Sequence, residues 1–188
     1  MKLYQLFDII NLLNLKEEYS NMNEKYLNEN NPKVLMKIKD LGEIEIEIFK
    51  DIAPITSENF LNLVKEGFYT NIIFHRVIEG FMIQGGDPTG TGMGGSKKTI
   101  KGEFDSNGFK NPIIHERGVI SMARTMNPNS ASSQFFIMHK NAPHLDGEYA
   151  AFGMVTKGIE VVDKIASVRT DYNDKPLKDV VIESAVIL

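Results

Sequence analysis

The spacing of apolar residues changes period near residue 33, and this change restricts most of the chain to a fold built of strands. From there, apolar residues occupy every second position in two runs: Val34, Met36, Ile38, Ile44, Ile46 and Ile48. The first three alternate with Lys33, Leu35, Lys37 and Lys39, and the last three alternate with Glu43, Glu45 and Glu47. A period of two is typical of half-buried strands, so residues 33–48 predict a hairpin that turns at residues 40–42. We expect its Lys and Glu rows to pair on a solvated face.

Residues 1–31 follow a helical period instead. Their apolar residues at helical spacing are Leu3, Leu6, Phe7, Ile10 and Leu13. An Asn-rich stretch then leads into Pro32, which stops the pattern. We therefore predict a helical extension over residues 1–31 and a separate domain over residues 32–188. The preferred interpretation is a helix that docks on its own domain, with contact to a second subunit or client as the alternative. Polar residues interrupt the apolar run too early for a signal peptide, and the polar face lacks the basic residues of a membrane anchor.

The rest of the chain predicts short strands and two helices. Pro54 and Gly67 delimit one helix, and the second covers residues 158–166. The strands are predicted at residues 72–77, 81–84, 119–123, 134–138, 150–154 and 180–187. Many short strands, Gly and Pro turns and two internal helices favour a mainly β protein, built as a closed antiparallel barrel or a sandwich.

Composition narrows the classes of function. With 188 residues, of which 42% are apolar, the chain can bury one sizeable core. Its net charge is −4 with both signs interspersed, so we expect no nucleic-acid partner. No apolar stretch approaches the roughly 18 residues of a membrane span, so we expect no membrane partner. The absence of cysteine excludes disulfides and a thiolate nucleophile and favours a cytoplasmic location.

Two local patterns suggest cofactor chemistry, and we interpret both as structural. Residues 90–95 match the letters of the dinucleotide-binding fingerprint, but no helical pattern follows them, which favours a tight surface loop. A nucleotide-binding enzyme remains the alternative. The four histidines share no metal-ligand spacing, and G-x-S-x-G is absent. We therefore expect no metal, no cofactor and no hydrolytic nucleophile.

Residues 74–87 carry the strongest functional signal. They place a permanent cation, Arg76, and an amide, Gln84, among large apolar residues with no nucleophile nearby. This mixture suits non-covalent work on a neutral group. The segment resembles the signature strand pair of the cyclophilin family of peptidyl-prolyl cis-trans isomerases. Residues 118–124, 132–137 and 145–153 resemble further blocks of that family in the same order, and the resemblance runs from about Val34 to Leu188.

The resemblance implies a closed, eight-stranded, antiparallel cyclophilin-like β-barrel with two capping helices. It also implies an isomerase that accelerates rotation about Xaa-Pro peptide bonds in protein folding, by non-covalent stabilisation of the twisted amide and without a cofactor. The implied partners are proline-containing segments of unfolded or flexible proteins. A proline-peptide binding module that lacks turnover is the main alternative.

The resemblance also assigns the site residue by residue. Arg76 matches the catalytic arginine, and Gln84 matches its neighbouring amide. Phe81, Met82, Phe136 and Leu145 match the apolar walls of the proline pocket. Ala123 and Arg124 match the strand whose backbone holds the extended substrate, and Gln134 matches a polar contact beside it. His144 replaces a frequent Trp, which implies weakened cyclosporin binding. Tyr149 replaces a frequent His, and residues 124–128 form a rim one residue longer than the usual Asn-Ala-Gly-Pro.

Overall fold

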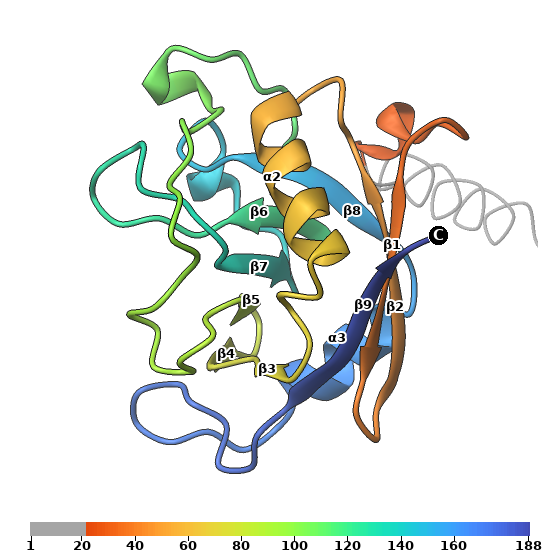
Figure 1. The fold of residues 1–188 in the computed structure, drawn as a ribbon, viewed down its shortest axis with the longest axis vertical. Helices are drawn as coiled ribbons and strands as arrows, with labels where there is room; N and C mark the ends of the chain where they lie inside the picture. Colours follow the sequence, from red (N-terminus) through yellow and green to blue (C-terminus); the bar gives the residue numbers. More distant parts are fainter. Residues whose placement is uncertain (1–21) are drawn as a thin grey trace, which may run out of the picture.

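Nine strands form one curled antiparallel sheet in the computed structural model, which describes residues 22–188 (Figure 1). The strands are β1 (Lys33–Ile38), β2 (Gly42–Ile48), β3 (Ile72–Ile73), β4 (Arg76–Ile78), β5 (Met82–Gly85), β6 (Val119–Met122), β7 (Phe135–Met138), β8 (Ala151–Lys157) and β9 (Val181–Ile187). Their order in the sheet is β3-β9-β1-β2-β8-β6-β7-β5-β4. The predicted hairpin is confirmed as β1 and β2, with Val34 opposite Ile46.

The two ends of the sheet are neighbouring pieces of the chain. β3 pairs with β9, whereas β4 pairs with β5. Between them, the N–H of Phe74 donates to the carbonyl of Val180 (2.9 Å) and the N–H of His75 donates to the carbonyl of Gln84 (3.0 Å). The single strand predicted over residues 72–77 therefore changes partner in its middle and becomes two. The expected closed barrel of eight strands is not confirmed, because the described residues form nine strands and no ladder joins β3 to β4.

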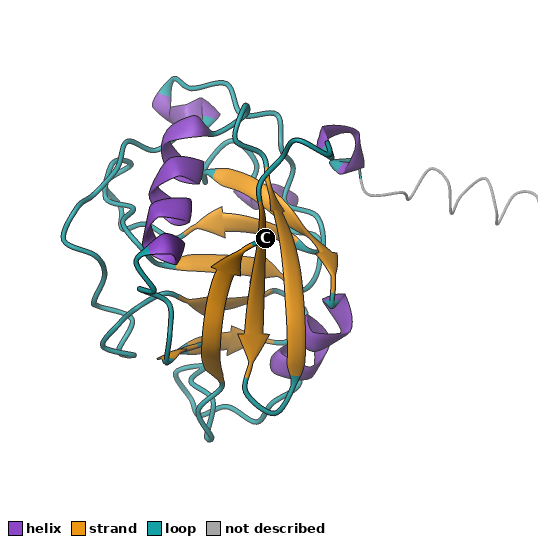
Figure 2. Ribbon diagram, turned by 45° about the vertical axis from the view of Figure 1, so that its right-hand side comes forward, coloured by secondary structure: helices purple, strands orange, loops and turns teal. Residues whose placement is uncertain are grey.

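Both predicted helices are confirmed, as α2 (Pro54–Lys65) and α3 (Ile159–Ala166). They pack at different ends of the curled sheet (Figure 2). The carboxylate of Glu103 accepts the N–H groups of Ile55 (3.0 Å) and Thr56 (2.8 Å), and so satisfies the first turn of α2. Three short 3-10 helices complete the secondary structure of the described part: η1 (Glu24–Tyr26), η2 (Asp105–Asn107) and η3 (Pro143–Leu145).

The buried side chains form two clusters on opposite faces of the sheet. In the larger one, the rings of Tyr69, Phe135 and Phe152 lie 5.1 to 5.7 Å from the ring of Phe60. The second contains Phe49, Met82, Ile113, Val119, Phe136, Met138, Ala142, Leu145, Ala151 and Met154. Because side chains alternate along a strand, neighbouring Phe135 and Phe136 of β7 belong to different clusters.

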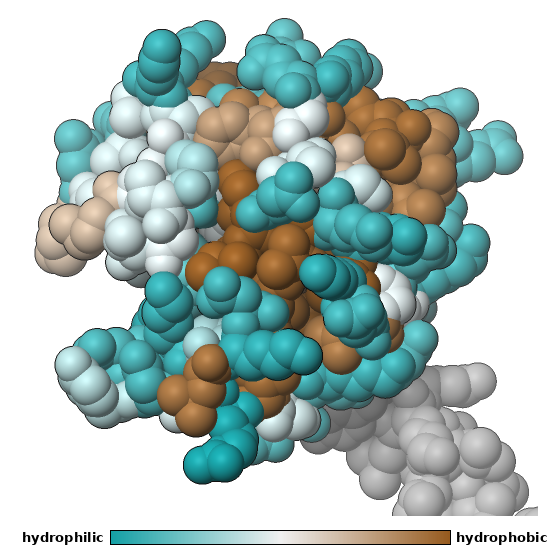
Figure 3. Space-filling model, turned by 60° about the horizontal axis from the view of Figure 1, so that its bottom comes forward, coloured by the Kyte–Doolittle hydropathy of each residue, from teal (hydrophilic) through white to brown (hydrophobic). Residues whose placement is uncertain are grey.

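The molecular surface mixes apolar and polar side chains. On the end of the molecule shown in Figure 3, apolar side chains gather in the middle and hydrophilic ones surround them. Among residues 22–188, no helix combines the length and hydropathy needed to cross a bilayer. Within the same range, no group of three or more His, Asp or Glu side chains is arranged to hold a metal ion.

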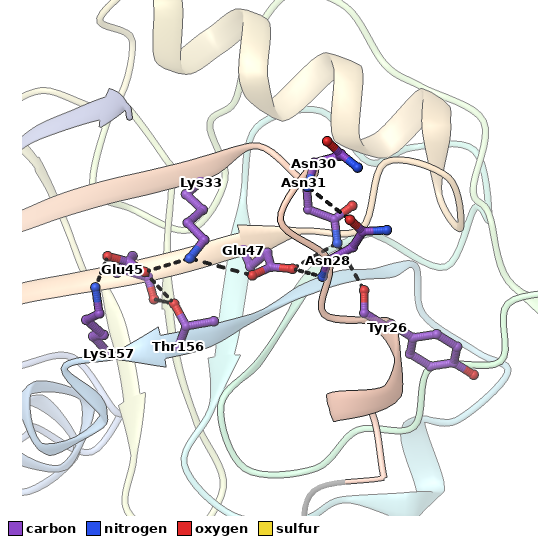
Figure 4. Close-up of polar contacts among 9 residues, drawn as sticks. All are labelled: Tyr26, Asn28, Asn30, Asn31, Lys33, Glu45, Glu47, Thr156 and Lys157. Atoms are coloured by element: carbon purple, nitrogen blue, oxygen red, sulfur yellow. Dashed lines mark hydrogen bonds and ion pairs between the residues drawn. The ribbon is translucent and has the colours of Figure 1, made fainter.

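One prediction about the hairpin is wrong. Lys33 does pair across the strands, with its Nζ 3.3 Å from Glu45 and 3.9 Å from Glu47. However, Glu45 and Glu47 are not solvated, because they are 7% and 4% exposed. Lys157 and Thr156 of β8 contact Glu45, and residues 28–31 contact Glu47 (Figure 4). Alternation identified the strand but not what lies on its polar face.

Most of the predicted N-terminal helix, residues 1–21, lies outside the described residues. Residues 22–31 contain η1 and turns and no α-helix. They make side-chain contacts with the sheet and with residues 112–116. The domain boundary between residues 31 and 32 stays a prediction.

Candidate active site

A pocket of about 390 Å³ opens beside β4, β5 and β7. Its lining is His75, Arg76, Phe81, Met82, Gln84, Thr91, Gly92, Ala123, Arg124, Phe136, Leu145, Tyr149 and Asn173. All the site residues suggested by the resemblance are in this lining except Gln134 and His144. Each of those two contacts a lining residue, since Gln134 bonds to Gln84 and His144 stacks on Phe81. The fold therefore brings together residues that are up to 73 positions apart, from Arg76 to Tyr149.

The floor of the pocket is apolar and well buried. Met82 of β5, Phe136 of β7 and Leu145 of η3 are 2%, 5% and 8% exposed. Tyr149 meets Phe136 edge-on, with ring centroids 5.7 Å apart. At the rim, Phe81 stacks on the exposed ring of His144 at 5.7 Å. A buried apolar floor with aromatic walls suits a compact apolar ring.

Arg76 faces this floor from the neighbouring strand. In the β4–β5 register it lies directly opposite Gln84, so the two side chains share one face of the sheet. The Arg76 side chain is 43% exposed, and its Nε lies 3.4 Å from Oδ2 of Asp174. The N–H of Val77 donates to the carbonyl of Asp174 (2.8 Å), which holds that loop against β4. A pair this exposed contributes at most about 1 kcal/mol, so its main effect is to orient the guanidinium.

A relay of amides fixes Gln84. Its Nε2 donates to Oε1 of Gln134 (2.9 Å). The Nε2 of Gln134 in turn donates to the carbonyls of Gly92 (2.9 Å) and Gly94 (2.7 Å). Because carbonyls can only accept, they determine which end of the Gln134 amide is the NH₂ group. The relay connects the amide beside Arg76 to the loop of residues 87–95.

The loop of residues 87–95 is stabilised by the carboxylate of Asp87, one of its own residues. Gly90 and Gly92 have φ values of 64° and 83°, as expected for a tight loop, and no helix follows. The carboxylate of Asp87 accepts backbone N–H groups from Thr89, Thr91, Gly92 and Gly94, at 2.6 to 3.1 Å. Burial opposes the charge, yet these hydrogen bonds lower the pKa of Asp87 to about 2. The N–H groups that a phosphate would need are therefore already taken by a carboxylate of the chain.

Behind the floor, His115 stacks on Phe136 with ring centroids 6.0 Å apart. Its Nδ1 lies 2.9 Å from Asp146 Oδ1, and its Nε2 lies 3.1 Å from Ser121 Oγ. Burial lowers the pKa of His115, and the hydrogen bond to Asp146 opposes this shift. The arrangement has the connectivity of a hydrolytic triad, but Ser121 is 0% exposed and cannot meet a substrate. It supports the aromatic wall instead.

Sequence reasoning missed several members of the site. The pocket lining also contains four residues that the sequence analysis did not assign to the site: His75, Thr91, Gly92 and Asn173. Asp174, the partner of Arg76, follows it by 98 positions. His75 could have been found from its place beside Arg76. The glycine pattern of residues 90–95 predicted a tight loop but not its place beside the pocket, because only the tertiary fold brings Thr91, Gly92 and Asn173 there.

Comparison with known proteins agrees with this architecture. The chain matches the family model "Cyclophilin type peptidyl-prolyl cis-trans isomerase/CLD" over residues 33–187. It is 45% identical over 149 residues to the peptidyl-prolyl cis-trans isomerase ppi1 of Schizosaccharomyces pombe, covering 79% of this chain and 94% of the relative. It is 46% identical over 150 residues to the peptidyl-prolyl cis-trans isomerase-like 3 of Dictyostelium discoideum, covering 78% and 90%.

Solved structures of the same family are also similar to this chain. A cyclophilin type peptidyl-prolyl cis-trans isomerase of Cryptosporidium parvum superposes with a TM-score of 0.78 at 35% identity, covering 84% of this chain and 98% of that one. The same Cryptosporidium protein in the presence of the dipeptide Ala-Pro gives 0.77 at 36% identity, covering 83% and 98%. Sheet, pocket, family model and relatives all agree, and the chain belongs to the cyclophilin-type family of peptidyl-prolyl cis-trans isomerases.

Proposed function

We propose that this pocket accelerates rotation about Xaa-Pro bonds by binding the amide in its twisted state, with Arg76 as the catalytic residue. Resonance keeps the amide planar, and breaking it costs about 18 to 20 kcal/mol. In the half-rotated state the nitrogen is pyramidal and regains its lone pair, while the carbonyl loses negative charge. A donor directed at that nitrogen binds the twisted state better than either planar isomer, and this difference is what catalysis requires.

One observation carries the proposal: the Arg76 guanidinium lines the same pocket as the apolar floor of Met82, Phe136 and Leu145. A guanidinium keeps its charge at every relevant pH and presents its donors in a rigid fork, so no proton transfer is needed. Gln84, fixed by the amide relay and opposite Arg76, is the second catalytic group and orients guanidinium or substrate. Neither group is needed for a module that only captures proline.

The apolar floor, with Phe81, is proposed to hold the pyrrolidine ring while the preceding residue swings. Burying a ring of this size contributes about 1.5 to 3 kcal/mol, equally for both planar isomers and the twisted state. The backbone of Ala123 and Arg124 is proposed to hold the extended chain, and the Arg124 guanidinium packs between Phe104 (5.0 Å) and Tyr149 (4.6 Å) as a side wall. The substrates are proline-containing segments of unfolded or flexible proteins, and the Ala-Pro dipeptide named for the Cryptosporidium structure supports this class.

Cyclosporin binding is proposed to be weak. His144 is exposed and stacks on Phe81 where the resembling family often has an indole, and an imidazole offers less apolar area to a ligand. The cytoplasmic location stays a prediction.

The test is the steady-state kinetics of Arg76→Ala on a Xaa-Pro peptide. By analogy with losing one oxyanion-hole donor, kcat/KM should fall by about 10² to 10³, or about 2.7 to 4 kcal/mol. The melting temperature should change little, because the side chain is 43% exposed. Arg76→Lys should not restore the rate fully, since an ammonium lacks the planar fork. Arg169→Ala, which alters an exposed arginine outside the pocket lining, is the matched control.

Each rival function predicts a different result. Unchanged turnover in Arg76→Ala would exclude Arg76 from the mechanism. A binding module predicts that the unaltered chain binds the peptide without accelerating its isomerisation in a coupled assay. A nucleotide-binding enzyme predicts a higher melting temperature in the presence of nucleotide. We expect no such increase, because the N–H groups of the loop already donate to the carboxylate of Asp87.

A further inference from the structure

Residues 22–31, here called the N-terminal strap, precede the family match at residues 33–187 yet are fastened to the domain by specific contacts. At one end, the N–H of Asn28 (2.7 Å) and Nδ2 of Asn31 (2.9 Å) both donate to Oε1 of Glu47, as Figure 4 shows. Asn31 Nδ2 also donates to the carbonyl of Tyr26 (3.0 Å). Glu47 is 4% exposed, and a buried carboxylate needs such donors. The strap therefore stabilises β2 by donating hydrogen bonds to the buried carboxylate of Glu47.

In the middle of the strap, Tyr26 packs on the second apolar cluster. Its ring lies 5.8 Å from that of Phe49 at an interplanar angle of 61°. Phe49 belongs to the same cluster as Met82, Phe136 and Leu145, the floor of the pocket. The strap thus contacts, from behind, the cluster that the substrate meets from the front.

At the other end, the side chain of Asn23 pairs with the backbone of a distant segment. Its Nδ2 donates to the carbonyl of Ile114 (2.8 Å), and its Oδ1 accepts the N–H of Ile114 (3.2 Å). Nδ2 also donates to Oε2 of Glu116 (3.2 Å). Asn23 is 1% exposed, so these bonds are shielded from water. Its amide pairs with the backbone of Ile114 much as a residue of a neighbouring strand would, and it also contacts the carboxylate of Glu116.

The residue between those two anchor points is His115, which supports Phe136. The N–H and Nδ1 of His115 contact Oδ1 of Asp146 at 2.6 and 2.9 Å, and the ring stacks on Phe136. With its ring nitrogens engaged, His115 can move only if its backbone moves. Asn23 holds the backbone of Ile114 on one side of His115 and the carboxylate of Glu116 on the other.

We propose that Asn23 is a positioning residue for the isomerase reaction: it fixes residues 114–116 so that His115 keeps Phe136 in place as the floor of the proline pocket. The inference rests on the proposed role of Phe136. Because the floor supplies binding that is equal in ground and twisted states, loss of Asn23 should raise KM and leave kcat nearly unchanged.

The experiment compares full-length Asn23→Ala with full-length Asn30→Ala. Asn30 lies in the same strap and is exposed, and its printed hydrogen bond comes from its backbone, so its side chain is a fair control within the described residues. Kinetics on a Xaa-Pro peptide and NMR spectra of the aromatic rings are recorded for both. We expect KM to rise about three- to tenfold in Asn23→Ala, with the Phe136 and His115 ring signals shifted. Asn30→Ala should match the unaltered chain in both measurements.

The outcomes distinguish a failure of the proposed isomerase function from a failure of the role proposed for Asn23. An inactive unaltered chain would refute the proposed function itself. An active chain whose Asn23→Ala variant melts at a lower temperature but keeps its KM and its Phe136 signals would overturn the inference and leave Asn23 a purely structural residue. If Asn23→Ala does not fold, Asn23→Ser, which can keep one hydrogen bond, and Glu116→Ala, which removes one acceptor, are measured instead. Unchanged KM in both of these would overturn the inference equally.

Discussion

Replacing Asp87 with Asn should destabilise the protein by about 2 kcal/mol at neutral pH. The carboxyl group has a pKa of about 2 in the fold against an ordinary value of 3.8. A difference of roughly 1.8 pKa units corresponds to about 2 kcal/mol of preference for the charged form. Asn has almost the same shape, but N–H donors meet both oxygens of Asp87, from Thr89 at Oδ1 and from Gly92 and Gly94 at Oδ2, and an amide can accept at only one of these two positions. The loss therefore comes from charge and hydrogen bonding, not from packing.

The direction of the pH dependence follows from the lowered pKa. Because the folded pKa lies below the unfolded one, the stabilisation is complete well above pH 4 and is lost as the pH falls towards 2. About 1 kcal/mol of it should be gone by pH 3. Urea unfolding at pH 7, 5, 4 and 3 measures this, with Asp51→Asn, an exposed carboxylate, as the control. The gap between unaltered protein and Asp87→Asn should narrow in acid, and a constant gap would refute the assignment.

Asp87→Asn should also lower the catalytic efficiency of the pocket. The carbonyls of Gly92 and Gly94 hold Gln134, which holds Gln84. A loosened loop should therefore lower kcat/KM severalfold, but less than Arg76→Ala does, because the guanidinium itself remains. The measurement is made at a temperature where the variant is folded. Unaltered kinetics would mean that Gln84 does not depend on the loop.

Three further substitutions form two tests of the pocket, one of its floor and one of its rim. Phe136→Ala should cost about 3 to 5 kcal/mol of stability and also raise KM. Phe135→Ala, on the opposite face of β7, should cost a similar amount of stability without raising KM. Kinetics paired with melting curves measure both, and equal KM values in the two variants would remove Phe136 from the proline pocket. His144→Trp should strengthen cyclosporin inhibition by about 1 to 2 kcal/mol, read from inhibition curves, while kcat/KM stays the same. Identical inhibition curves would show that the indole position does not limit the affinity.

Local pattern was enough to predict most of the elements. The alternation around Val34 and Ile46 gave the first hairpin, and Pro54 and Gly67 gave α2 within two residues of its observed end. Both signals depend on the chain's own periodicity and on residues that start or stop helices. The site residues came instead from a resemblance spread over four segments, because a pocket built by several strands and loops has no single local pattern.

What could not be predicted depends on contacts between distant segments. Glu47 reads as a solvated strand residue, and its burial follows from a strap that no periodicity describes. The change of partner at Phe74 and His75 depends on where Val180 lies, which the sequence of β3 and β4 does not state. Asp174 has φ 63° in a loop whose position against Val77 is set by the whole sheet. These are tertiary effects that override local preference.

The junction between β3 and β4 makes the proposed chemistry sensitive to the winding of the sheet. Arg76 follows directly after the point where the chain leaves one edge and joins the other. A slip of one residue there would turn Arg76 towards the core and present Val77 or His75 to the substrate. The rate of proline-peptide isomerisation therefore also reports whether the two edge strands of this sheet keep their register.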